Sequence, residues 1–193
     1  LEIIFIILGA LLLLNSVKLS GGLARINQYL MGVSEDKRIQ LLIIGYLFVS
    51  FLEGAAGFGA PAALAAPILV FLGFPALLAV SATLIADSTA VLFGAVGTPV
   101  SATVKTLSPA LQKTGMDAAP LVHDLSVNAG LLSLYTGLGV PLFMMAFAIF
   151  VFGDGNKKAK WSAFCEILPF TLYVGLAFLA PMWLLSYVSY ELS

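Results

Sequence analysis

Charged residues, cysteine and histidine are all scarce in this sequence. Only 10% of its 193 residues are charged, and it contains one cysteine and one histidine. Soluble domains carry about a quarter of their residues as charged side chains, so this chain lacks the surface of a water-soluble protein. The single cysteine, Cys165, excludes a disulfide framework and a cysteine-based metal site. The net charge of −1, with the few basic residues placed between apolar stretches, gives no reason to expect a nucleic-acid partner.

Patterns that carry catalytic chemistry are also missing. The glycine spacing does not match a dinucleotide fingerprint, and there is no P-loop. His123 lies beside Asp124 in a polar stretch, which favours a solvated residue over a catalytic base. An intramembrane protease would need paired aspartates, or a serine–histidine or histidine–glutamate set, at membrane depth, and no such pairing is evident. We therefore predict that the protein is not an enzyme and uses no cofactor or metal.

Apolar residues dominate what is present. They make up 61% of the chain, and the mean hydropathy is +1.06. A helix needs about 20 apolar residues to cross the roughly 30 Å hydrocarbon core of a bilayer. Stretches of this kind predict spans at about 1–17, 76–100, 127–152 and 164–187. The first begins without a methionine or a cleavable signal, so we expect an internal piece of a longer protein. The sequence predicts an all-α, multi-pass integral membrane protein.

Three polar segments separate the apolar stretches. Residues 101–126 are interpreted as a polar connection and 153–161 as a basic loop. If 41–72 returns to the side from which it enters, the positive-inside rule places 18–40 and 153–161 in the cytoplasm and 101–126 outside. Within 18–40, one face of a short surface-lying helix is expected from Leu23, Ile26, Leu30 and Val33.

The stretch 53–61 is the strongest irregularity in an apolar region. It reads EGAAGFGAP, and it separates apolar arms at 41–52 and 62–72. At a rise of about 1.5 Å per residue, neither arm is long enough to cross a bilayer. Two short arms joined by a glycine- and proline-rich tip predict a re-entrant hairpin over about 41–72, which needs protein or water around its backbone. A pair of ordinary spans is the alternative.

The backbone of this tip predicts a binding site for an anion. Glycine lets the backbone approach a ligand closely, and successive N–H groups form a nest for negative charge. Pro61 suits the first turn of the following arm, whose positive dipole end would face the tip. Helix packing through the small residues Ala55 and Gly59 is the alternative. The candidate substrate-binding residues at the tip are Gly54, Ala55, Gly57, Phe58 and Gly59.

A second interruption, DSTAVLFGAVGTP, follows at 87–99. Secondary transporters pair broken helices to build a site near the membrane midplane from half-helix ends and unwound carbonyls. We therefore interpret 76–100 as a discontinuous helix whose break pairs with the hairpin tip. The serine and threonine hydroxyls have an alternative role in satisfying helix backbone. The candidate substrate-binding residues of this break are Ser88, Thr89, Gly97 and Thr98.

Three carboxylates lie inside apolar segments. Such a group costs at least about 2.5–3.5 kcal/mol at the bilayer centre on insertion scales, so it marks function. Glu166 follows closely on Lys160 and Trp161, which places it in the solvated interface. Glu53 and Asp87 each open a helix-breaking stretch. They are candidates for proton or ion coupling, and the capping of backbone N–H groups is the alternative role for both.

The two interrupted segments resemble a known family. The stretches SEDKRIQLLIIGYLFVSFLEGAAGFGAPAALAAPILVFLGFP and FGAVGTP closely resemble the L-lactate permease family of bacterial membrane transporters, most clearly over 34–99. The resemblance implies inverted repeats, each with a re-entrant hairpin and a broken helix. This chain would then be one repeat half of a secondary transporter in the bacterial cytoplasmic (inner) membrane. Its partners would be the lipid bilayer and the missing second repeat of the same chain.

The resemblance also implies a substrate and a coupling ion. Family members take up L-lactate and related small 2-hydroxy monocarboxylates, such as glycolate, by symport with protons. One departure is that the family usually has asparagine where this chain has Asp87. A second buried carboxylate beside an anion site must be protonated, paired with a cation or turned away. Another anion permease of the same fold, including a sodium-coupled one, is the first alternative; a membrane enzyme or a non-transporting scaffold is the second.

Overall fold

The computed structural model describes residues 34–57, 60–114 and 118–189, together with scattered positions between 8 and 32. The predicted span at 1–17 therefore lies largely outside the described residues. The expected apolar face of Leu23, Ile26, Leu30 and Val33 lies outside them entirely.

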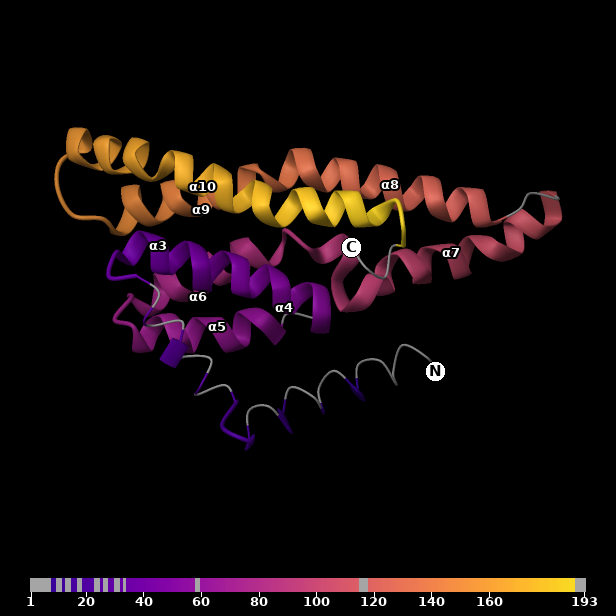
Figure 1. Cartoon of the computed structure of the whole chain (residues 1–193), viewed down its shortest axis with the longest axis horizontal. Helices are drawn as coiled ribbons and strands as arrows, with labels where there is room; N and C mark the ends of the chain where they lie inside the picture. Colours follow the sequence, from indigo (N-terminus) through magenta and orange to yellow (C-terminus); the bar gives the residue numbers. More distant parts are fainter. Residues whose placement is uncertain are drawn as a thin grey trace.

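The described chain is a series of helices (Figure 1). A continuous helical rod is formed by α3 (Lys37–Leu42), a π-helical turn (Ile43–Phe48) and α4 (Val49–Ala56). It is followed by α5 (Ala60–Phe71), α6 (Ala76–Asp87), a short 3₁₀ turn (Val91–Phe93) and α7 (Gly94–Thr114). The second half contains α8 (Ala118–Gly137), α9 (Gly139–Phe147) with a π-helical turn (Ala148–Phe152), and α10 (Lys157–Ser186).

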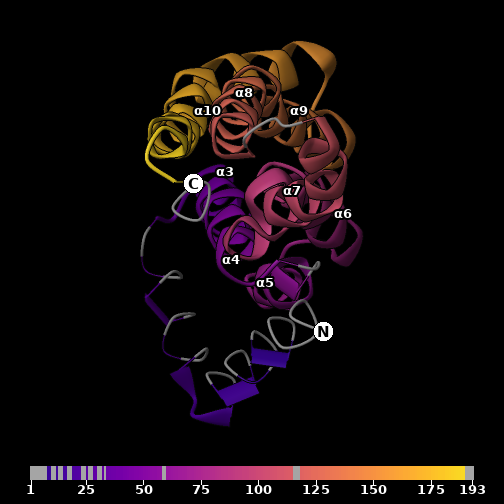
Figure 2. The ribbon, with the colours of Figure 1, turned by 90° about the vertical axis from the view of Figure 1, so that its right-hand side faces the viewer.

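The helices form two layers. Viewed from the end, α8, α9 and α10 lie on one side, and α3 to α6 lie on the other (Figure 2). A core of buried apolar side chains fills the space between the layers, where Met144 and Met145 of α9 join Leu42 and Leu69 of the other layer. A smaller apolar cluster, which includes Phe93, Val100, Leu179 and Met182, connects the α7 region to α10. The layers are therefore held together mainly by burial of apolar surface.

Three described helices are long and apolar enough to cross a membrane: Lys37–Ala56, Pro120–Phe152 and Lys157–Ser186. A fourth crossing is available if Ala76–Asp87 and Val91–Pro109, which are bent by 59° at a short break, act as one broken span. These helices confirm the predicted all-α integral membrane fold. The bent pair lies where the sequence predicted a discontinuous helix.

The first arm of the hairpin differs from the sequence expectation. Instead of ending at 52, the helical rod begins at Lys37 and runs through Glu53 to Ala56, a length of 20 residues. Its polar start is capped by Asp36, whose side chain accepts from the N–H of Arg38. Glu53, which the sequence placed in the break, is therefore part of the helix. The next described helix begins at Ala60.

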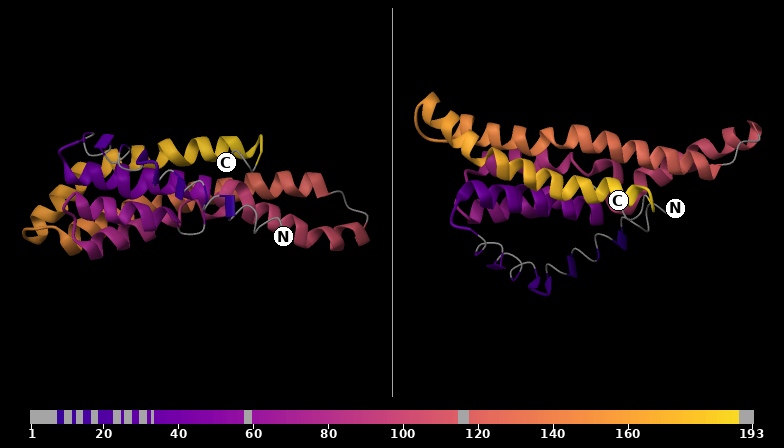
Figure 3. Two further views of the ribbon diagram at one scale, coloured as in Figure 1. Left: turned by 90° about the horizontal axis from the view of Figure 1, so that it is seen from below. Right: turned by 45° about the horizontal axis from the view of Figure 1, so that its top comes forward.

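The segment 101–126 also differs from the expected polar connection. It is helical on both sides of its turn, as the end of α7 and the start of α8. These two helices run beyond the rest of the bundle as a long hairpin (Figures 1 and 3). Polar side chains along them do not prevent helix formation, because a helix that leaves the bundle keeps its polar groups solvated.

The start of α3, the end of α5 and the start of α6 meet at one end of the bundle. Lys37 Nζ lies 3.0 Å from the carbonyl oxygen of Leu72, directly after α5. Both α5 and α6 contain 12 residues, which is about 18 Å of helix. The hairpin tip and the break after α6 consequently lie at the same depth.

Candidate functional site

The hairpin tip and the helix break touch directly. Gly57 ends α4 with a φ of 64°, a conformation that glycine adopts without the penalty of a side chain. A Cβ atom on Gly57 would stand 2.8 Å from the Cβ of Ala95, in the break of α7. Only a residue without a side chain permits this contact. The predicted pairing of the two interruptions is therefore present in the fold.

Glu53 lies one turn before the tip and points into the same contact. Its side chain is buried, with 5% of its surface exposed. A Cβ atom on Gly94, the first residue of α7, would stand 2.8 Å from Glu53 Oε1. The absence of a side chain at Gly94 thus makes room for the carboxyl group. Glu53 thus connects α4 with the break at the start of α7.

The partner of Glu53 is Asp87, the last residue of α6. The side chains of the two residues lie close enough to interact. An ionised carboxylate only accepts hydrogen bonds, so two carboxyl groups can share one only when one of them carries a proton. Of the three options left by the sequence for Asp87, the geometry fits protonation or sharing of a proton within the pair. We call Glu53 and Asp87 the carboxyl pair.

The break itself has an unusual backbone. Ala95, Val96 and Gly97 all have positive φ values of 47°, 57° and 71°. Alanine and valine rarely adopt this left-handed conformation, which costs roughly 1–2 kcal/mol per residue for side chains with a Cβ. Thr98 Oγ1 donates to the carbonyl of Ala95 at 2.5 Å, which satisfies one carbonyl of the turn. Strain of this kind persists where the surrounding packing enforces it.

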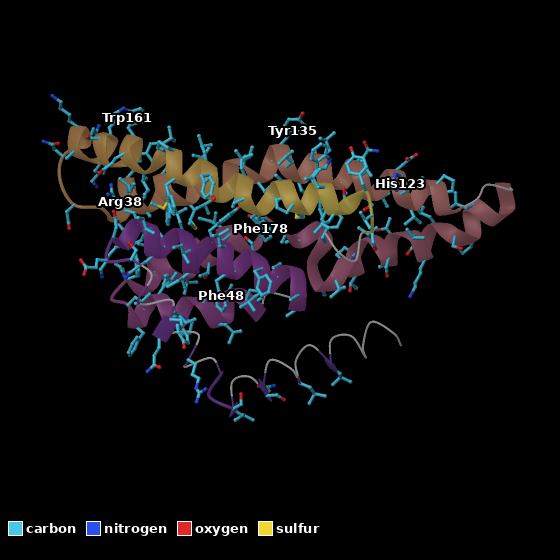
Figure 4. The ribbon with its side chains drawn as sticks, in the orientation of Figure 1. Arg38, Phe48, His123, Tyr135, Trp161 and Phe178 are labelled. Carbon is cyan, nitrogen blue, oxygen red and sulfur yellow. The ribbon has the colours of Figure 1, made fainter. Side chains whose placement is uncertain are left out.

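A cavity of about 420 Å³ opens beside the break. One wall is α4, through Ser50, Gly54 and Ala55; another is Val96 of the break. The opposite wall comes from α10, including Phe178, whose side chain faces the α4 layer in Figure 4. Its size falls within the range of small-molecule sites, which are mostly apolar with few polar groups. The cavity adjoins the contact that holds the carboxyl pair.

The structure places the predicted binding residues in different surroundings. Gly54 and Ala55 line the cavity, and Gly57 forms the tip contact, whereas Phe58 and Gly59 lie outside the described residues. The hydroxyls of Ser88 and Thr98 donate to backbone carbonyls, at 2.6 Å for Ser88. Gly97 is buried in the left-handed turn, and Thr89 is buried with its hydroxyl facing that of Tyr46.

Sequence reasoning missed several residues of this region. Tyr46 and Ser50 lie on the face of the helical rod that carries Glu53, two turns and one turn earlier respectively, and both are fully buried. The ring of Tyr46 packs edge-on against Phe178, with the ring centroids 6.4 Å apart. The spacing of Tyr46, Ser50 and Glu53 along one helix face is a polar stripe that was visible in the sequence. No comparable pattern in the sequence indicated that α10 forms a wall of the cavity.

The other end of the bundle is built differently. Arg38 makes ion pairs with Asp36 at 2.7 Å and with Glu166 of α10 at 2.8 Å. Figure 4 shows Arg38 at this end, near Trp161. Glu166 is exposed, as expected for an interface residue, and the hydrogen bond from Arg38 lowers the pKa of Asp36. A cavity of about 350 Å³ lies here. The basic side chains that line it already bond to other groups of the protein, which indicates that they stabilise this end of the bundle.

This fold, with a carboxyl pair beside a strained helix break, defines an all-α integral membrane protein of the broken-helix type. The family described as L-lactate permease matches residues 1–193. The chain belongs to the L-lactate permease family. No solved structure shows a significant match to it.

Named relatives agree with this assignment. An L-lactate permease of Streptococcus iniae is 38% identical over 191 residues, which covers 98% of this chain and 36% of that protein. An L-lactate permease of Halalkalibacterium halodurans is 38% identical, covering 86% of this chain and 28% of that protein. The glycolate permease GlcA of Escherichia coli K12 is 34% identical, covering 98% and 30%. The chain thus spans about a third of the length of these relatives.

Proposed function

We propose that this chain forms part of a secondary transporter that takes up L-lactate and related small 2-hydroxy monocarboxylates together with protons. The observation that carries the proposal is the close approach of two carboxyl groups, Glu53 and Asp87, beside the cavity. The names of the relatives, which are lactate and glycolate permeases, support the substrate class. They also favour a transporter over an enzyme. The protein would act in the bacterial cytoplasmic membrane.

The carboxyl pair gives a physical route to coupling. With one shared proton the pair carries a single negative charge, which repels a carboxylate substrate in the adjoining cavity. A second proton makes the pair neutral and removes this repulsion. Protonation therefore favours substrate binding and, by thermodynamic linkage, substrate binding favours protonation by the same factor. The substrate carboxylate would be held by backbone N–H groups of the tip and the break.

Glu53→Gln tests the proton role with little change in geometry. The amide of glutamine donates a hydrogen bond to Asp87, so the contact survives while the ionisable group is lost. We expect the variant to lose pH-driven accumulation of labelled L-lactate in cells expressing the complete gene that encodes this chain. Glu35→Gln, at an exposed position before α3, is the matched control. Unchanged pH-dependent uptake in Glu53→Gln overturns the proton role, and absence of lactate uptake by the wild type overturns the substrate.

Asp87→Asn distinguishes the two carboxyl groups. Asparagine also donates to Glu53, and the resemblance places asparagine at this position in other members of the family. We expect Asp87→Asn to retain uptake with a shifted pH dependence, because Glu53 keeps its titratable group. Loss of pH dependence in Asp87→Asn but not in Glu53→Gln would assign the proton to Asp87 instead.

A sodium-coupled anion permease is the second candidate. Hard cations such as sodium prefer oxygen ligands of the kind that the carboxyl pair presents. Replacing sodium by choline in the uptake medium separates the two candidates. Proton coupling predicts unchanged uptake at constant pH, whereas sodium coupling predicts its loss.

A further inference from the structure

Several buried hydroxyl groups in the described part of the chain bond to backbone carbonyls. Thr83 donates to the carbonyl of Ala79 at 2.9 Å and Thr171 to that of Ile167 at 2.9 Å. Ser186 donates to the carbonyl of Trp183 at 2.6 Å. This is the usual way in which serine and threonine are accommodated inside helices. A buried hydroxyl that does not follow this pattern needs another explanation.

Three buried hydroxyls depart from this pattern: those of Tyr46 and Thr89, which face each other, and that of Ser50. Ser50 is fully buried, and its Oγ atom has no hydrogen-bond partner among the residues that the structure describes. It follows a π-helical turn, in which the carbonyl of Tyr46 accepts from the N–H of Val49. Leaving a buried hydroxyl unbonded is unfavourable by about 1–3 kcal/mol. Turns of this π-helical type are frequent at functional sites.

The position of Ser50 supplies a reason for this arrangement. Ser50 lines the 420 Å³ cavity, and among the described residues around that cavity it has the only polar side chain. The rest of the wall is apolar, with Phe51, Phe178 and Met182 among its members. Sites for small molecules obtain their selectivity from a few polar groups set in an apolar wall. In this cavity, Ser50 is the side chain that can supply such a contact.

We propose that the Ser50 hydroxyl binds the 2-hydroxyl group of the substrate and thereby selects 2-hydroxy acids over simple carboxylic acids. The proposal rests on the proposed uptake of 2-hydroxy monocarboxylates. A hydroxyl both donates and accepts, so it matches another hydroxyl in either direction. The carboxylate of the substrate would remain with the backbone N–H groups, and its short alkyl group would contact the apolar wall formed by Phe178 and its neighbours.

Propionate is the probe that isolates this contact, because it is lactate without the 2-hydroxyl group. We measure how well unlabelled L-lactate and propionate each compete with labelled L-lactate, in cells expressing the complete gene. In the wild type, lactate should compete better than propionate. In Ser50→Ala, lactate should compete about tenfold less well, the value of one hydrogen bond between neutral groups. Competition by propionate should stay unchanged, so the ratio between the two acids falls towards one.

Two further variants separate recognition from structure. Ser186→Ala removes a buried hydroxyl that is bonded to the backbone and does not line the cavity, so the ratio should stay at the wild-type value. Ser50→Thr keeps a hydroxyl and should retain part of the preference for lactate. If Ser50→Ala does not transport, the same ratio is read from thermal stabilisation of the purified protein by each acid.

The outcomes are distinct. A lactate-to-propionate ratio that is unchanged in Ser50→Ala, or that falls equally in Ser186→Ala, overturns the role of Ser50. In that case uptake of lactate by the wild type still supports the proposed function. Absence of lactate uptake and of stabilisation by lactate in the wild type overturns the proposed function itself.

Discussion

Gly57 at the end of α4 packs directly against Ala95 in the break of α7. The two residues belong to separate interruptions of the helical structure, and a Cβ on Gly57 would stand 2.8 Å from the Cβ of Ala95. The tip of the hairpin and the break are consequently one structural unit. A change at either residue displaces the other, which makes this contact the best place to test the fold.

Gly57→Ala should destabilise the protein. Alanine would clash with Ala95 and would also adopt an unfavourable positive φ, for a combined loss of roughly 2–4 kcal/mol. Gly54→Ala is the matched control, because a Cβ there has nothing within 4 Å and lies inside a helix. It should be neutral or stabilising, by up to about 1 kcal/mol. Thermal unfolding of the purified full-length protein measures both; equal effects of the two variants would contradict the tip contact.

Gly94→Ala should disturb the carboxyl pair without removing an ionisable group. The new Cβ would stand 2.8 Å from Glu53 Oε1 and would push the carboxyl group away from Asp87. We expect a shifted pH dependence of lactate uptake and a loss of roughly 1–3 kcal/mol of stability from overpacking. Gly139→Ala, where nothing lies within 4 Å of the new Cβ, should preserve the wild-type pH profile. An identical profile for both variants would argue against the observed position of Glu53.

Gly137 and Leu179 should be energetically coupled. A Cβ on Gly137 of α8 would stand 2.7 Å from Leu179 Cδ2 of α10, so Gly137→Ala should overpack this interface by roughly 1–3 kcal/mol. Leu179→Ala should cost about 2–5 kcal/mol through a cavity. The double variant should lose less than the sum, because the new methyl group enters the space left by leucine. Additive losses in thermal unfolding would show that the two residues do not meet.

Asp36 should stabilise the fold only above acidic pH. Its pKa lies below the ordinary value of 3.8, chiefly because its side chain is hydrogen-bonded to Arg38. A depressed pKa means that the stabilisation is fully present above about 3.8 and is lost as pH falls through the lower, folded-state pKa. Asp36→Asn keeps the helix cap but should lose up to about 1 kcal/mol at neutral pH, the usual value for a partly exposed pair.

The measurement is the difference in thermal stability between the wild type and Asp36→Asn as a function of pH. The difference should vanish in acid. A difference of the same size at pH 7 and below the pKa of Asp36 would assign the effect to something other than charge.

The positions of both interruptions were predictable from sequence, because glycine and proline limit where a helix continues. The exact end of the first arm was not. Glu53 opens a stretch that reads as a helix break, but glutamate itself favours helices, and α4 continues to Ala56 with the buried carboxyl group in contact with Asp87. That contact joins two helices and depends on tertiary packing, so no local pattern contains it.

Two other features escaped sequence reasoning for different reasons. The segment 101–126 is polar, and hydropathy cannot distinguish a polar loop from helices that leave the membrane. The role of Ser50 was hidden because a serine inside a helix normally bonds to its own backbone. That the Ser50 hydroxyl is unbonded, after a π-helical turn, is visible only in the structure.

The order in which the carboxyl pair is made constrains biogenesis. Glu53 is synthesised before Asp87, and the two carboxyl groups belong to different helices. If α4 entered the membrane ahead of α6, its apolar residues would have to offset an insertion penalty of about 2.5–3.5 kcal/mol for a lone carboxylate. Joint insertion of α4 and α6, or uptake of a proton by Glu53, would lower that penalty.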